Sequence, residues 1–101
     1  MEDYLKKIKE LKVGMNKVDV VGKIKEIGNA VEFESNGKKA RIANAIIKDD
    51  SGEIKLIIFN DDIDKIKVGD KIKICQGYTL EYSNELRLYI SKYGKRYEVI
   101  K

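Results

Sequence analysis

The sequence predicts an all-β fold, a small five-stranded antiparallel barrel in Greek-key order. Short segments in which apolar and polar residues alternate recur along the 101-residue chain, and turn signals separate them. Alternation with a period of two is the pattern of a half-buried strand. No stretch between the segments has room for a long helical crossover, which argues against a βαβ arrangement. Residues 1–101 are therefore expected to form a single domain.

The first segment, EDYLKKIKEL at residues 2–11, predicts an N-terminal amphipathic helix. Its apolar side chains recur at helical spacing, and its acidic residues come first, where they suit the helix dipole. Five strands are expected to follow, at residues 17–27, 41–48, 54–59, 70–82 and 86–92. Gly22, inside the first of them, indicates a bulge or a bend.

The connections between these strands carry their own signals. Residues 28–40 contain the turn pair Asn36-Gly37 and are expected to form a hairpin-like arm. Residues 60–66 predict a short helix between the third and fourth strands, with Asn60 or Asp61 as its N-cap. The last residues, RYEVI, suggest a final edge strand. A bulged first strand and a helix between strands three and four are typical of the five-stranded OB-fold barrel, with an SH3-like barrel as the structural alternative.

The composition argues against several classes of function. The chain has no His and one Cys, which argues against Cys/His zinc sites and His-activated nucleophiles. It contains no phosphate-cradling glycine motif, so we expect no enzyme activity, no metal and no cofactor. No apolar run is long enough for a membrane span. The net charge of +4 permits a polyanionic partner, but a solvated, heat-tolerant surface explains it equally well.

Strand alternation predicts which side chains point outward. In the third strand the apolar residues that alternate toward the core leave Lys55 and Phe59 outside, because successive side chains point to opposite faces. The same pattern in the fifth strand leaves Arg87 and Tyr89 outside.

The fourth strand requires a change of register. Strict alternation from Ile72 and Ile74 would bury Tyr78 and Tyr82. Gly77 allows a bulge just before Tyr78, and we favour this change because the core would otherwise have to hold two phenols. The tyrosines of GYTLEYSNELRLYIS are therefore expected on the outer surface. Packing or terminus contacts are expected for the other aromatic residues, Tyr4, Phe33, Tyr93 and Tyr97.

From Val18 to Ile100 the chain resembles the OB domains of archaeal replication protein A and the related simple archaeal single-stranded-DNA-binding proteins. The resemblance rests on an ordered series: a curved first strand, IIKDDSGEIKLIIF, a short helix, IKVGDKIKI and GYTLEYSNELRLYIS. The family stacks bases on aromatic residues of its open face. The matching positions are Phe59, Tyr78, Tyr82 and Tyr89. The family often has Trp at the first two, so the rings here are smaller.

Basic residues complete the expected site. Lys55 and Arg87 lie beside the outward rings, and Lys38, Lys39 and Arg41 lie at the base of the arm, where they are expected to neutralise phosphates. For each of them alone, a solvated surface role is the competing interpretation.

The resemblance implies sequence-tolerant binding of single-stranded DNA in replication, repair and recombination. It also implies sister OB domains in a longer chain, or other replication and repair proteins, as partners, and a cytoplasmic, nucleoid-associated location. Two alternatives stay open. The same exposed rings would suit an OB domain used for protein interaction or assembly, and stacking alone does not distinguish DNA from RNA.

Overall fold

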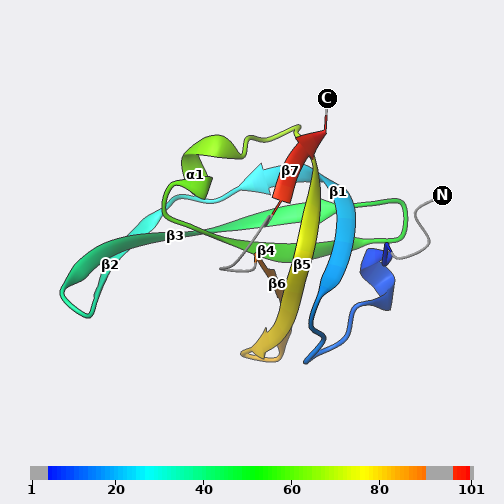
Figure 1. Cartoon of the computed structure of the whole chain (residues 1–101), viewed down its shortest axis with the longest axis horizontal. Helices are drawn as coiled ribbons and strands as arrows, with labels where there is room; N and C mark the ends of the chain where they lie inside the picture. Colours follow the sequence, from blue (N-terminus) through cyan, green and yellow to red (C-terminus); the bar gives the residue numbers. More distant parts are fainter. Residues whose placement is uncertain (1–4, 91–96, 101) are drawn as a thin grey trace.

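The computed structural model describes residues 5–90 and 97–100, which form seven strands and two short helical segments (Figure 1). The strands are β1 (Val18–Ile27), β2 (Val31–Ser35), β3 (Lys38–Lys48), β4 (Glu53–Phe59), β5 (Lys71–Tyr82), β6 (Glu85–Tyr89) and β7 (Tyr97–Ile100). The helical segments are the 3-10 turn η1 (Ile8–Glu10) and the one-turn helix α1 (Asp62–Lys65). Neither is long and apolar enough to cross a membrane, a finding restricted to the described residues.

Five of the strands pair in a closed ring. β1 pairs with β3, β3 with β4, β4 with β6, β6 with β5, and β5 again with β1. The β4–β6 pair is parallel, so the expectation of a purely antiparallel sheet is wrong at this point. β2 pairs with β3 and forms with it an arm that leaves the ring, while β7 lies along β5 (Figure 1). The predicted all-β OB-fold is confirmed, and β2 and β7 are added to the five strands of the ring.

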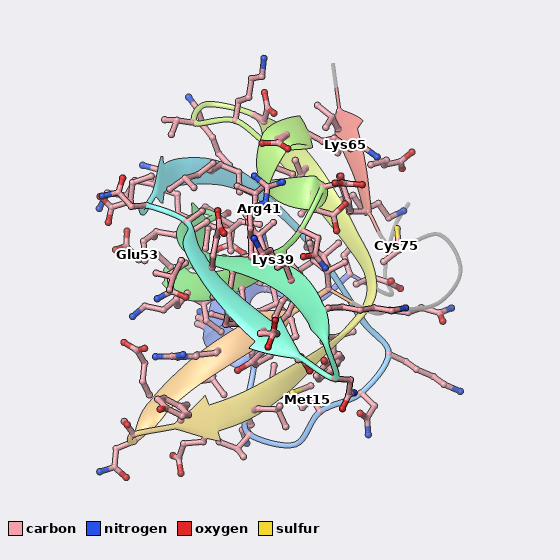
Figure 2. The ribbon with its side chains drawn as sticks, turned by 90° about the vertical axis from the view of Figure 1, so that its left-hand side faces the viewer. Met15, Lys39, Arg41, Glu53, Lys65 and Cys75 are labelled. Atoms are coloured by element: carbon pink, nitrogen blue, oxygen red, sulfur yellow. The ribbon has the colours of Figure 1, made fainter. Side chains whose placement is uncertain are left out.

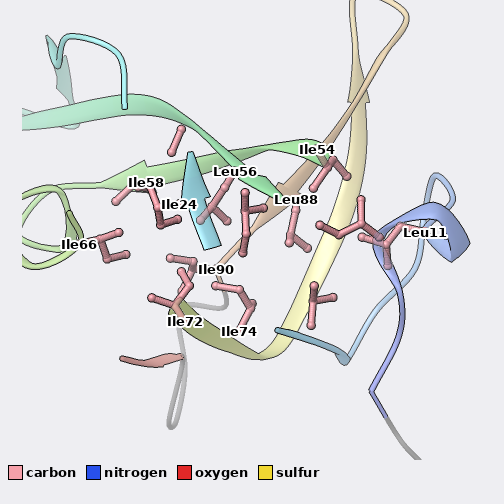
Figure 3. Packing of buried hydrophobic residues seen from close by; sticks show 14 of the residues in the cluster. Leu11, Ile24, Ile54, Leu56, Ile58, Ile66, Ile72, Ile74, Leu88 and Ile90 are labelled. Carbon is pink, nitrogen blue, oxygen red and sulfur yellow. The ribbon is translucent and has the colours of Figure 1, made fainter. Parts of the chain in front are cut away.

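Aliphatic side chains from all five ring strands fill its interior (Figure 3). Leu11 lies at one end of this core and Ile66, just after α1, at the other. Side chains with no exposed area include Val20, Ala45, Ile47, Leu56, Ile58, Ile72, Ile74 and Leu88. Burying one such Leu, Ile or Val side chain contributes about 1.5–3 kcal/mol, so the ring is a stable frame for what its outer face carries.

The predicted N-terminal helix is wrong over the residues that the structure describes. Leu5 instead forms a β-bridge with Asp19, and the Lys6 N–H donates to the Asp19 carbonyl at 2.8 Å. Only η1 is helical, and it places Ile8 and Leu11 against the core. Pairing with β1 thus overrides the helical spacing of this segment, which the local sequence cannot reveal.

The turns follow the sequence more closely. Asn36 and Gly37 both have positive φ, 53° and 77°, as a two-residue turn between β2 and β3 requires. The predicted short helix is present as α1, with Asp61 at its N-cap position but without a side-chain capping bond. The irregularity of β1 lies between Ile24 and Glu26, where β1 has one residue more than β3, rather than at Gly22.

Candidate nucleic-acid interface

A row of outward side chains crosses β5, β6 and β4. The register places Tyr78 opposite Tyr89, and Tyr89 beside Ile57. The two tyrosine rings are stacked, with 5.2 Å between their centroids and 7° between their planes. Ile57 is fully buried yet lies outside the core cluster, so its outward neighbours must cover it. Partial burial, and to a smaller extent Tyr89, raises the pKa of the Tyr78 phenol.

The predicted change of register before Tyr78 is confirmed. Ile74 and Thr79 both point inward and are almost fully buried, although strict alternation would place them on opposite faces. The extra residue is accommodated around Gln76, whose φ of 54° is left-handed. The pairing of β5 with β1 shifts at the same point. Tyr78 and Tyr82 therefore point outward, as the sequence suggested.

Gly77 makes this register possible because no side chain fits there. A Cβ atom at this position would lie 2.8 Å from the carbonyl oxygen of Tyr89 and 2.9 Å from Cγ2 of Ile74. The backbone of β5 can therefore approach β6 closely just before the Tyr78–Tyr89 pair. Thr79 anchors the following residues, since its Oγ1 accepts from the Met15 N–H at 2.9 Å.

The arm extends this apolar surface. Phe59 lies opposite Ile42 of β3, and Ile42 lies opposite Val31 of β2, so all three side chains share one face. Phe33 lies opposite Ala40 on the same face. Val31 is 61% exposed and Phe33 40% exposed, whereas Phe59 is half-buried. We call the outer surface that carries these rings the aromatic face; its members are Phe33, Phe59, Tyr78, Tyr82 and Tyr89.

The expectation that Phe33 packs is wrong, because no described strand lies on the second edge of β2 and all residues of β2 are exposed. The sequence held a usable signal: a turn at Asn36-Gly37 fixes the register that puts Phe33 on the face of Ile42. Tyr97 does pack against the core, and its hydroxyl donates to Asp62 at 3.0 Å. Tyr4 and Tyr93 lie outside the described residues.

Beside the rings lies an ionic cluster centred on Glu85. One carboxylate oxygen, Oε1, lies 2.9 Å from Nζ of Lys55 and 3.2 Å from Nε of Arg87. The Arg87 guanidinium also lies over the ring of Tyr82, 4.6 Å from its centroid. Hydrogen bonds, first from Lys55 and then from Arg87, lower the pKa of the Glu85 carboxyl even though desolvation opposes them. Sequence reasoning chose both cations but missed the acid that holds them.

The basic residues of the arm divide between its two faces. Lys38 lies opposite Ser35, on the side of Phe33, whereas Lys39 and Arg41 lie opposite acidic residues on the other side. Arg41 donates to Asp64 at 2.8 Å, and this bond lowers the pKa of the Asp64 carboxyl. Figure 2, viewed from the side of the arm, shows Arg41 close to α1. Of the three arm cations, the structure thus places only Lys38 with the aromatic face.

A closed ring of this strand order, with a protruding β2–β3 arm, is an OB-fold, a class of domain that binds oligonucleotides and oligosaccharides across this outer surface. The family described as single-stranded DNA binding protein Ssb-like, OB fold, matches residues 6–98, and the chain belongs to it. The expected family is therefore confirmed.

Individual proteins with a similar sequence or structure agree with this family assignment. The single-stranded DNA binding protein Ssb of Saccharolobus solfataricus is 27% identical over 82 residues, which are 81% of this chain and 55% of the relative. The chain thus spans about half the length of that protein. The structure of an OB domain from Thermoplasma acidophilum superposes with a TM-score of 0.81 at 25% identity, covering 95% of this chain and 86% of that one. The replication factor A related protein of Methanobacterium thermoautotrophicum gives 0.79 at 23% identity, covering 99% and 94%, and supports the fold alone.

Proposed function

We propose that this domain binds single-stranded DNA, with little sequence preference, by stacking bases on the aromatic face. The observation that carries the proposal is the outward display of five rings on one continuous surface of β2, β4, β5 and β6. Every base has a flat π-face, so rings bind single strands without reading their sequence, at about 1–3 kcal/mol per stacked base. Membership of the Ssb-like family supports the same ligand.

The five aromatic side chains differ in their exposure and in their neighbours. Tyr82, 61% exposed and next to Arg87, is an open platform with a cation beside it. Tyr78 and Tyr89 already stack on each other, so they act as one preformed unit rather than as two separate platforms. Phe59 and Phe33 continue the surface onto the arm. A strand crossing the face would meet these rings in succession.

Lys55, Arg87 and Lys38 are the cations placed to contact the phosphates of that strand. Lys55 and Arg87 are attached to β4 and β6 between the rings, and Lys38 shares the arm face of Phe33. Because Glu85 holds the first two through one carboxylate oxygen, a phosphate that binds them competes with this carboxylate for their positive charge. The site works by binding alone, without metal, nucleotide or turnover.

We further propose that the domain acts in replication, repair and recombination. Its partners would be sister OB domains of a longer chain or other proteins of these processes, in the cytoplasm and associated with the nucleoid.

Fluorescence-anisotropy titrations with oligo-dT, the same length of RNA and duplex DNA test the proposal at one salt concentration. We expect oligo-dT to bind more tightly than the duplex, since paired bases hide the faces that the rings need. Equal affinity for the two would leave only charge attraction and contradict stacking. Tighter binding of RNA would keep the mechanism but change the ligand. Failure to bind any of the three would leave the exposed rings as a protein-interaction surface.

A further inference from the structure

Three lysines lie directly opposite one another on three neighbouring strands of the ring. The register pairs Lys23 of β1 with Lys48 of β3 on one side and with Lys71 of β5 on the other. All three side chains are exposed, and directly opposite residues project to the same face of a sheet. We call these residues the lysine row.

The lysine row is unfavourable for folding, because like charges directly opposite one another destabilise a strand pair. Two exposed lysines near the row have acidic partners: Lys7 bonds to Asp50 at 2.8 Å and Lys25 to Glu53 at 3.1 Å. Within residues 5–90 and 97–100, no such ion pair involves a member of the row. Three uncompensated positive charges are thus held side by side.

The row lines a surface hollow of about 470 Å³, whose floor includes Val21 and Gly22. Lys6 and Lys7 also line it, together with Asp49 and Asp50. Among the described residues of the lining, five lysines and two aspartates give a formal charge of +3. Both acids are already engaged, Asp50 by Lys7 and Asp49 by four hydrogen bonds, from the backbone N–H groups of Ile8, Ser51 and Gly52 and from the hydroxyl of Ser51.

The hollow is distinct from the aromatic face. β1 and β5 cross in front of β3 and β4 in Figure 1, and the next residue around the ring after Lys48 is Glu53 on β4. Glu53, paired with Lys25, therefore separates the row from the ionic cluster of Glu85. Among the residues that the structure describes, none of those lining the hollow is aromatic, so these residues can contact a strand's backbone but cannot stack its bases.

We propose that the lysine row is a second phosphate-binding site, which takes the backbone of a single strand after that strand has left the aromatic face. The inference rests on the proposed function and extends its site. A lysine ammonium acts as a compact point charge that suits phosphate without demanding a fixed geometry. A short strand would occupy the aromatic face alone, whereas a longer one would also reach the row. Each phosphate contact made by the row adds about −0.7 to the log–log dependence of affinity on salt.

The test measures the binding of two lengths of oligo-dT, about 6 and about 24 nucleotides. An OB-fold covers about 4–16 nucleotides, so the short strand fits on the aromatic face and the long strand extends beyond it. The variant Lys23→Gln/Lys48→Gln/Lys71→Gln should bind the short strand like the wild type. On the long strand it should lose about tenfold in affinity at low salt, and its salt slope should be shallower by about two. Its melting temperature should be unchanged or higher, because repulsion within the row is relieved.

A control variant removes the same charge from exposed lysines outside the hollow: Lys12→Gln/Lys65→Gln/Lys67→Gln. If row and control variants lose the same affinity for the long strand, only net charge matters and the second site is overturned. It is also overturned if the affinity of the wild type depends equally on salt for the two strand lengths. A third contradicting result is that an acidic peptide binds at the lysine row while long oligo-dT does not. Wild-type protein that binds neither length would overturn the proposed function itself.

Discussion

Tyr82 and Phe59 would report base stacking differently because their burial differs. Tyr82 is 61% exposed, so Tyr82→Ala should leave the melting temperature nearly unchanged while weakening oligo-dT binding by about 1–3 kcal/mol. Phe59 is half-buried, so Phe59→Ala should cost the same in binding and also lower the melting temperature. Tyr97→Phe, which removes the hydroxyl bonded to Asp62, should do the opposite and reduce stability alone. Anisotropy and thermal unfolding of each variant check this pattern. Unchanged binding by both alanine variants would exclude these rings from the site.

Glu85 gives the site a pH dependence with a definite sign. Lys55 and Arg87 lower its pKa, so its contribution to folding is present above its unfolded pKa and is lost as pH falls through the folded value. Binding should respond oppositely, because a protonated Glu85 releases both cations to the still-ionised phosphates.

We expect Glu85→Gln to tighten oligo-dT binding about two- to fivefold at neutral pH, the scale of an exposed ion pair. It should also remove the rise in affinity that we expect of the wild type in acid. Glu53→Gln is the matched control, since it removes the same charge from an exposed pair with Lys25. Equal effects of the two variants would mean that Glu85 has no special role.

At the residue scale, alternation predicted the outward direction of Phe59 and Tyr89, and the register change expected at Gly77 predicted that of Tyr82. It could not show that Tyr78 and Tyr89 stack on each other, because that contact depends on the pairing of β5 with β6. The contact between Glu85 and Lys55 was missed for the same reason, since cross-strand neighbours are set by register rather than by sequence distance. The contact between Glu85 and Arg87 is local, because the two lie two residues apart on one face of β6, so alternation alone could have indicated it.

Among the elements, β5 depends on the absence of a side chain at one backbone position, Gly77. A methyl group at Gly77 would press on the Tyr89 carbonyl and on Ile74, so Gly77→Ala should cost about 1–3 kcal/mol in unfolding free energy. It should also weaken oligo-dT binding, because the display of Tyr78 depends on this register. Gly52→Ala is the control, since a Cβ there meets nothing within 4 Å. Chemical denaturation of both variants measures the difference, and equal stability would show that β5 tolerates the methyl group.

The β2–β3 arm should contribute to binding without contributing to the stability of the ring. Phe33→Ala and Val31→Ala should each weaken oligo-dT binding, with unchanged melting temperatures. The loss should reach about 1–3 kcal/mol for Phe33→Ala, which removes an aromatic side chain. Val68 offers a matched control, because its side chain is 61% exposed, like that of Val31, but lies between α1 and β5. If Val68→Ala weakens binding as much as Val31→Ala, the arm is not a specific part of the interface.

At the scale of elements and of the whole molecule, the sequence predicted the strands of the ring and its turns because each depends on local alternation or on a local pair such as Asn36-Gly37. It missed the bridge between Leu5 and Asp19, the parallel β4–β6 pair and the exposure of Phe33. All three depend on which distant segments pair, or on an edge left unpaired. The lysine row is hidden in the sequence in the same way, since its members lie on three different strands.

The most direct test of the account is an NMR titration of the aromatic side-chain signals with oligo-dT. Bases that stack on the aromatic face should shift the ring protons of Phe59, Tyr82 and Phe33 upfield, while those of Tyr97, which packs against the core, should stay in place. Saturable shifts of this kind would establish where the bases bind. Binding that leaves the aromatic signals unchanged and perturbs only lysine side chains would contradict base stacking.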